Sequence, residues 1–298
     1  MRLYQSIICI SSFVSNFCTA QEGKQLPKDP FERFGPYGMS IHKDLKTALG
    51  IERNVYKLDL SYQKLEEKQY EKICKLADLQ ALKLSGNEVT DYPKNFEALT
   101  NLVFFASYNN KFKDFPLKLS SFQSLNYLEL QHTLIDSIPA RIAYLSNLKT
   151  LKFGNTDDTL KLPLSFKFMK RLQDVTFENC VLDSFPKQLF KIPKLTFLYL
   201  ANTNTHYLTK HFERLKNLEV LIIENNPIDT IPWEIYKAQK LRFISLRNNK
   251  LTKIPESISQ LPELSVLDLS GNPIDPTEIE IIKLLVPGCE VKFTQQGK

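Results

Sequence analysis

Leu241 to Pro255 reads L-R-F-I-S-L-R-N-N-K-L-T-K-I-P, and Leu218 to Pro232 reads L-E-V-L-I-I-E-N-N-P-I-D-T-I-P. Both stretches fit the frame L-x-x-L-x-L-x-x-N-x-L-x-x-I-P. The first leucine of this frame recurs at Leu79, Leu102, Leu125, Leu148, Leu172, Leu195, Leu218, Leu241 and Leu264, in steps of 23 residues with a single step of 24. Such a period predicts a stack of coils that bury their apolar faces against one another, because one coil cannot do so alone.

The letters of the frame predict the path of each coil. The L-x-L segment alternates with a period of two, which is typical of a short strand with Leu267 and Leu269 facing inward and Asp268 facing outward. One strand per coil predicts a parallel sheet. The proline that closes the frame has a restricted φ and no N–H to donate, so we expect it to begin the return segment on the other side of the coil.

An asparagine recurs at the ninth position, where its amide is expected to bond the turn backbone of its own and the adjoining coil. It is present as Asn87, Asn110, Asn226, Asn249 and Asn272. The middle coils instead carry Thr133, Thr156, Cys180 and Thr203, which offer fewer or weaker donors. Two interpretations stay open: a less stable centre of the array, or a routine substitution within this ladder.

The frame resembles the leucine-rich repeat family. The apolar pair after it, as at Ile258 and Leu261, resembles the 23-residue subclass of bacterial proteins and Ras-suppressor-type scaffolds. The resemblance covers Val55 to Phe293. It implies an α/β fold: a curved, horseshoe-like solenoid of about ten coils with a concave parallel β-sheet.

Both ends of such a stack need a cap, because the terminal coils would otherwise expose apolar surface. At the front, helical spacing from Ile41 to Leu49 predicts a helix with Ser40 as its N-cap and Gly50 as its stop. At the back, Asp275 and Pro276 predict the start of a helix that runs to Leu285, followed by a closing strand over 289–293. The expected organisation is 1–20 leader, 21–54 N-terminal extension and capping helix, 55–275 repeats and 276–298 C-terminal cap.

The first twenty residues are typical of a secretory signal peptide. A single charge at Arg2 precedes an apolar stretch around 7–17, and the small residue Ala20 stands at the expected cleavage point. This predicts a protein that is secreted or located in the periplasm or cell envelope; the alternative is a cytosolic N-terminus. No later stretch approaches the roughly 20 apolar residues of a membrane span. The dispersed Cys74, Cys180 and Cys289 are expected to be free thiols, which fits a bacterial envelope protein.

Charge and motifs argue against several functions. The formal net charge is +6, with lysines and acids interleaved and without an aromatic-basic cluster, so nucleic-acid binding is not expected. The histidines are scattered, and the chain lacks a phosphate-binding glycine loop and a nucleophile elbow. We therefore predict neither an enzyme nor a cofactor or metal protein. Carboxylates on the sheet are expected to form cross-strand ion pairs, such as Glu129 with Lys152 and Glu224 with Arg247.

Candidate binding residues occupy the outward positions of the strands, because aromatic and arginine side chains on a rigid face dominate protein–protein hot spots. One group consists of Phe104, Tyr108 and Tyr127, and the other of Phe197, Tyr199, Ile222 and Phe243, with Glu224 and Arg247 beside them. For Phe104, Tyr127, Phe197 and Phe243 the alternative is that they only cover the sheet edge.

The leading interpretation is an exported, non-catalytic module that binds a protein or peptide ligand through its concave face. The first alternative is a cytosolic scaffold or adaptor of the Ras-suppressor type. The second is an envelope protein that binds a glycan through a column of asparagines at the eighth position. The members of this column are Asn155, Asn179, Asn202, Asn225 and Asn248, and their other interpretation is that they shape the turn.

Overall fold

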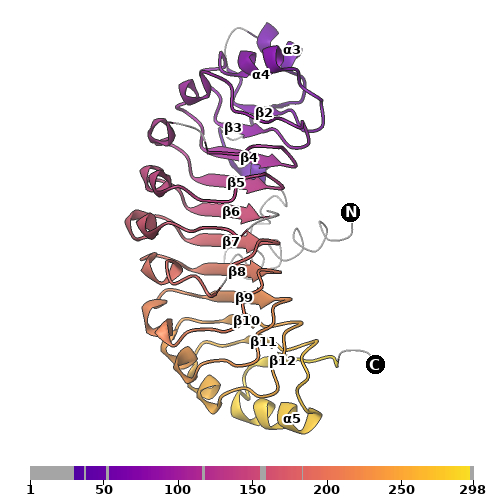
Figure 1. Ribbon diagram of the computed structural model, residues 1–298, viewed down its shortest axis with the longest axis vertical. Coiled ribbons are helices and arrows are strands. Elements are labelled where there is room, and N and C mark those ends of the chain that lie inside the picture. Colours follow the sequence, from indigo (N-terminus) through magenta and orange to yellow (C-terminus); the bar gives the residue numbers. More distant parts are fainter. Residues whose placement is uncertain are drawn as a thin grey trace.

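The computed structural model describes residues 30–36, 38–51, 54–115, 118–154, 159–182 and 184–295; the predicted leader lies outside them. Within these residues, twelve strands form one parallel sheet in sequence order, with short helical turns on the opposite side of the stack (Figure 1). The strands are β1 (Ile41–His42), β2 (Lys57–Asp59), β3 (Ala81–Lys83), β4 (Phe104–Tyr108), β5 (Tyr127–Gln131), β6 (Thr150–Gly154), β7 (Asp174–Glu178), β8 (Phe197–Ala201), β9 (Val220–Glu224), β10 (Phe243–Ser245), β11 (Val266–Asp268) and β12 (Glu290–Lys292). The predicted curved solenoid with a parallel sheet is confirmed.

Register follows the repeat. Each strand residue pairs with the residue at the same place in the next coil, so that Leu198 lies beside Leu221 and Leu221 beside Ile244. The single 24-residue step is absorbed outside the ladder, since Leu151 still pairs with Val175. Identical positions therefore form columns that run the length of the sheet, and inward and outward columns alternate as the sequence predicts.

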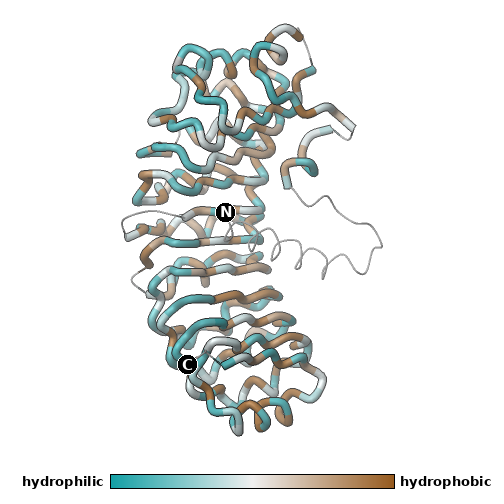
Figure 2. The backbone as a smooth tube through the Cα atoms, turned by 90° about the vertical axis from the view of Figure 1, so that its right-hand side faces the viewer, coloured by the Kyte–Doolittle hydropathy of each residue, from teal (hydrophilic) through white to brown (hydrophobic). Residues whose placement is uncertain are grey.

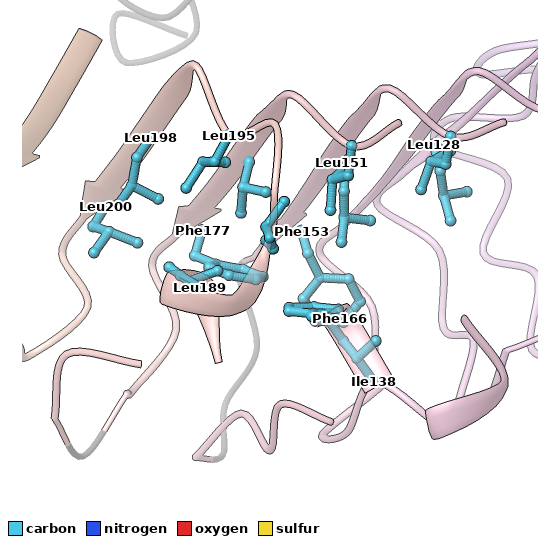
Figure 3. Close-up of a cluster of buried hydrophobic side chains, with 14 of the residues drawn as sticks. Leu128, Ile138, Leu151, Phe153, Phe166, Phe177, Leu189, Leu195, Leu198 and Leu200 are labelled. Carbon is cyan, nitrogen blue, oxygen red and sulfur yellow. The ribbon is translucent and has the colours of Figure 1, made fainter. Parts of the chain in front are cut away.

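The inward columns and the return segments enclose a continuous apolar core. In Figure 3, Leu128, Leu151 and Leu198 point from strands β5, β6 and β8 into the stack, toward side chains such as Phe166 and Leu189 of the helical turns. Each of these five side chains is at most 3% exposed. Fully burying such a side chain contributes roughly 1.5–3 kcal/mol, so the core is the main source of stability.

The side opposite the sheet is built from single 3-10 turns rather than α-helices. They are η1 (Phe96–Ala98), η2 (Leu119–Ser121), η3 (Ala140–Tyr144), η4 (Leu164–Phe168), η5 (Leu189–Lys191), η6 (His211–Arg214), η7 (Trp233–Lys237) and η8 (Glu256–Gln260). Pro139, Pro163, Pro232 and Pro255 precede four of them in extended backbone. At these four sites, proline begins the return segment as predicted.

The ninth-position asparagines connect neighbouring coils, as expected. Asn249 Nδ2 donates to the carbonyls of Ile223 and Leu246, each at 2.8 Å, so that one amide joins two coils. In the same way, Asn272 Nδ2 donates to Leu246 O and Leu269 O, while its Oδ1 accepts from Leu251 N. These bonds satisfy backbone groups that the buried turn would otherwise leave unpaired.

Threonine continues part of this ladder in the middle coils. Thr203 Oγ1 lies 3.0 Å from Asn226 Oδ1 and 2.9 Å from Thr205 Oγ1, so a hydroxyl pair stands where a leucine is expected at position 205. Cys180 occupies the same column as a buried free thiol, and Cys74 and Cys289 are also free, as predicted. Leu160 is also buried in the main core.

The eighth-position column is explained by backbone conformation. Asn179, Asn202, Asn225 and Asn248 have φ values between +48° and +54°, a left-handed region that asparagine and glycine tolerate best. Gly271, at the same place in a later coil, has φ +75°. The side chains also bond along the column, for example Asn248 Nδ2 to Asn225 Oδ1 at 2.8 Å. These asparagines shape the turn, and Asn155 lies outside the described residues.

The C-terminal cap matches its prediction, whereas the N-terminal cap differs. Helix α5 (Pro276–Leu285) begins after Asp275, whose carboxylate accepts from Thr277 N, and β12 closes the sheet. At the front, the prediction of a helix from Ser40 was wrong. Residues 41–42 form the edge strand β1, and helix α3 (Leu45–Gly50) begins after Asp44, which accepts from Thr47 N. Helix α4 (Glu67–Ile73) packs against α3.

We expect Asn226→Ala to lower the free energy of unfolding by roughly 3 kcal/mol, because it leaves three buried backbone groups of the preceding coil without partners. Asn226 Nδ2 donates to Leu200 O, and its Oδ1 accepts from Thr203 N and Thr205 N. Urea unfolding measures the loss. The control is Asn225→Gly at an exposed left-handed position, with an expected change of about 0.5 kcal/mol or less. Equal losses in both variants would contradict the ladder's role.

Candidate functional site

The predicted binding residues lie on the outward columns, and all of the aromatic and aliphatic ones except Tyr108 fall into the two groups that the sequence suggests. Phe104 pairs with Tyr127 across β4 and β5, and their rings stack with centroids 4.4 Å apart. Phe197 pairs with Val220, which pairs with Phe243, across β8 to β10. Tyr108 is set apart from Phe104 and Tyr127, because its ring meets the edge of His132 at 4.5 Å.

The first group is not open surface, because the chain covers it with its own N-terminal segment. This segment, residues 30–36, comprises the short helix α2 (Pro30–Arg33) and the three residues after it, and we refer to it as the strap. Phe31 meets Phe104 edge-on with centroids 5.4 Å apart, while Phe34 lies 5.1 Å from Phe104 and 5.7 Å from Tyr127. As a result Phe104 and Tyr127 are 1% and 4% exposed. Figure 2 shows the strap beside the upper strands, outside the stack of coils.

Two features of the strap's sequence set its conformation. Pro30 supplies the fixed φ that suits the first turn of a helix, and Gly35 ends the turn with φ +82°, followed by Pro36. A Cβ on Gly35 would lie 3.1 Å from Lys57 Cε, so glycine also permits a close approach to the sheet. Lys57, itself buried, donates from Nζ to the carbonyl of Glu32 at 3.1 Å. A cation therefore meets the carbonyl end of the turn, where it is favoured.

The floor under the strap is hollowed by two alanines. Ala81 and Ala106 occupy outward positions where other coils carry larger residues, and they cluster with Phe31, Phe104 and Tyr127. Lys83 Nζ lies 4.7 Å from the Phe31 ring centroid. Sequence reasoning missed the strap and this floor. The available signals were two phenylalanines in a polar stretch and two small residues in outward columns.

The second group forms a compact apolar cluster over β8 to β10. Tyr199, Ala201, Val220 and Ile222 are its buried members, and Phe197 and Phe243 flank them half-buried. Tyr199 and Ile222 are buried although they occupy outward positions, because outward side chains on neighbouring strands lie close enough to pack against one another. Burial also raises the pKa of the Tyr199 hydroxyl, so the phenol stays neutral.

Charged residues border this second cluster. Glu224 is half-buried and accepts from Ser245 Oγ at 2.5 Å, while the exposed Arg247 lies 3.6 Å from Asp268 on the next strand. The predicted cross-strand ion pair between Glu224 and Arg247 is therefore replaced by a hydroxyl bond and a pair with Asp268. The reason is that Ser245 and Asp268, at the fifth position of their coils, lie closer to these groups.

A polar belt separates the two apolar groups. Tyr127 donates from its hydroxyl to Glu129 Oε2 at 2.6 Å, and Lys152 Nζ lies 5.6 Å from the Tyr127 ring. Glu129 therefore bonds a tyrosine rather than forming the predicted pair with Lys152. Glu178 belongs to the same belt, with Gly154 and Ala201 as its register partners on the adjoining strands.

Glu178 is a buried acid of this face whose pKa is raised. It is 3% exposed, and its Oε2 atom has no hydrogen-bond partner among the described residues. Burial raises the pKa of this carboxyl to about 7, and Glu129 adds to the rise, while Lys152 opposes it. Burial likewise raises the pKa of Asp174 and of Glu224. The belt therefore holds protons that an exposed glutamate would release.

Two kinds of feature are absent from the described part of the chain. It holds no group of three or more His, Cys, Asp or Glu side chains placed to bind a metal ion. None of its helices has the length and apolar character needed to cross a membrane.

Known proteins match this chain over parts of its length. The family model described as leucine rich repeat matches residues 216–274. Over 124 residues, or 41% of this chain, the sequence is 28% identical to adenylate cyclase of Schizosaccharomyces pombe. That stretch is 7% of the cyclase, so the match concerns a small part of a much longer protein.

Solved structures share the architecture at low identity. A crystal structure of TLR13 with ssRNA13 is 22% identical with a TM-score of 0.70, covering 85% of this chain and 38% of that one. The ectodomain of the Arabidopsis thaliana receptor kinase GASSHO1/SCHENGEN3, in complex with CASPARIAN STRIP INTEGRITY FACTOR 2, is 22% identical with a TM-score of 0.54, covering 80% and 29%. At this identity the likeness concerns the fold.

The buried Glu178 predicts a pH-dependent stability. Because its folded-state pKa of about 7 lies above the usual 4.5, its contribution is complete below about pH 4.5 and is lost as the pH rises to about 7. We expect the free energy of unfolding to fall across this window by on the order of 2 kcal/mol from this group. The free energy of unfolding of the Glu178→Gln variant, whose side chain stays neutral, should fall less. Urea unfolding of both chains from about pH 4.5 to about pH 7.5 measures the difference; superimposable profiles would refute it.

Proposed function

We propose that this chain, which belongs to the leucine-rich repeat family, is a non-catalytic module that binds a protein or peptide ligand on its concave sheet. The observation that carries the proposal is the apolar cluster over β8 to β10. Phe197 and Phe243 stand at its margins, and Glu224 and Arg247 lie beside it. An aromatic patch with charges at its edge has the composition of a protein-binding hot spot surrounded by a polar rim.

Two further observations bear on the kind of ligand. TLR13 and GASSHO1/SCHENGEN3 share this fold and are both seen in complexes, the former with ssRNA13 and the latter with CASPARIAN STRIP INTEGRITY FACTOR 2. On this chain, however, the carboxylates of Glu129 and Asp268 lie on the sheet face. Carboxylates repel a phosphate backbone, so the face favours a polypeptide over RNA. The glycan alternative rested on the eighth-position asparagines, whose presence the left-handed turns explain.

We expect Phe197→Ala/Phe243→Ala to weaken ligand binding by at least about tenfold, because the variant removes both flanking rings of the cluster. The test selects peptides from a displayed library on the immobilised parent chain and then measures their affinity for each variant. The matched control is Tyr144→Ala/Phe168→Ala, which removes two exposed aromatic side chains from the opposite face. Peptides that lose affinity only for the control variant, or a selection without enrichment, would refute the proposal.

We also propose that the chain is exported and that cleavage follows Ala20. The support is the leader-like composition of residues 1–20, which lie outside the described residues. We expect the full chain, expressed in a secreting host, to appear outside the cytosol with Gln21 as its first residue. N-terminal sequencing and intact mass check this, and Ala20→Leu should block cleavage because the cleavage site needs a small residue. Recovery of uncleaved chain from the cytosol would favour the scaffold alternative instead.

A further inference from the structure

The strap occupies the concave face in the manner of a bound peptide. Phe31, Ala81, Phe104, Ala106 and Tyr127 form a cluster that is separate from the solenoid core. Capping is carried out elsewhere, since β1, α3 and α4 lie at the front end of the stack (Figure 1). The strap covers strands β3 to β5 on their outward side, a place where the stack itself does not require a cover.

The aromatic contacts require two phenylalanines at a defined spacing along the strap. Phe31 lies in α2 and Phe34 directly follows it, and with this three-residue spacing both rings contact the Phe104 ring on the sheet. Phe31 enters the hollow over the two alanines and is 1% exposed, while Phe34 lies against the stacked Phe104–Tyr127 pair. A single ring would fill only one of these two positions.

The polar contact is made to the backbone of the strap rather than to one of its side chains. Lys57 Nζ donates to the Glu32 carbonyl, and the Glu32 side chain is exposed. Lys83 lies over the Phe31 ring, where a cation is attracted to the aromatic face. The side chain at position 32 is therefore not part of the contact, and the recognised pattern is two phenylalanines three residues apart, Phe-x-x-Phe.

We propose that this seat, made by Ala81, Phe104, Ala106 and Tyr127 with Lys57 and Lys83, is a second ligand site that binds a Phe-x-x-Phe turn of a partner protein. The strap is a tethered occupant that the partner displaces. A four-residue helix is too short to be stable by itself, so its order depends on the seat. Because it is tethered, it competes at a high local concentration. The site is distinct from the cluster over β8 to β10, and its test does not depend on a ligand being found there.

The test uses the full chain and a labelled peptide with the sequence of residues 28–38, K-D-P-F-E-R-F-G-P-Y-G. In Phe31→Ala/Phe34→Ala the seat is vacated, and we expect saturable binding by fluorescence anisotropy. The parent chain should bind at least about tenfold more weakly, because its strap competes. Absence of binding to a variant with a native circular dichroism spectrum would overturn the proposal.

Matched variants locate the binding. A peptide with both phenylalanines replaced by alanine should not bind, and adding Ala106→Trp to the vacated chain should abolish binding because it fills the hollow. Glu32→Ala in an otherwise unchanged chain should behave as the parent, since Glu32 is engaged through its carbonyl. Equal binding to the chains with and without Ala106→Trp would overturn the assignment to this seat.

A second measurement keeps the proposal testable if the vacated chain does not fold. The parent chain is photo-crosslinked to the peptide carrying benzoylphenylalanine in place of its first phenylalanine. Crosslinks within 81–83 or 104–131 support the seat, and crosslinks elsewhere or none overturn it. Dimerisation of the parent that disappears in Phe31→Ala/Phe34→Ala would also overturn it, in favour of strap exchange between two copies of this chain.

Discussion

A coil of about 23 residues is too small to bury its own leucines, and this constraint shapes the whole molecule. Each coil must present the same inward positions at the same height, so that Leu198, Leu221 and Ile244 meet across neighbouring strands. The backbone must then turn at the same place in every coil. The left-handed residues of the eighth column and the amides of the ninth satisfy that need, because they allow the turn and pair its buried polar groups.

Strict register has a second consequence, on the outward side. It aligns outward residues into columns in which successive residues are about 4.8 Å apart, so their side chains touch whether or not they are apolar. Where the columns are aromatic or aliphatic, they form packed clusters such as Tyr199 with Ile222. Where they are acidic and next to small residues, as at Glu178 beside Gly154 and Ala201, a carboxyl becomes buried and its pKa rises. One geometric rule thus produces both the apolar patches and the perturbed acid.

The strap shows what this face can bind. Its two phenylalanines rest on residues that the solenoid does not need for its own core, in a hollow that Ala81 and Ala106 create. The proposed functions of the two apolar groups therefore differ. The first is already filled by a segment of the chain and is regulated by its release, whereas the second has charged residues at its border and serves an external ligand directly.

The sequence by itself determined the periodic part of the structure: the strand in each coil, the parallel register, the prolines before the return turns, the asparagine ladder and the C-terminal cap at Asp275. These features depend on contacts within one coil or between neighbours at a constant separation, and a repeated pattern reports such contacts. Only the tertiary structure decided that residues 41–42 join the sheet and that Asp44 begins α3. It alone also decided that Phe31 and Phe34 cover Phe104 and Tyr127, and that Glu178 is buried. Those outcomes depend on the space left between side chains from distant parts of the chain, which local periodicity does not encode.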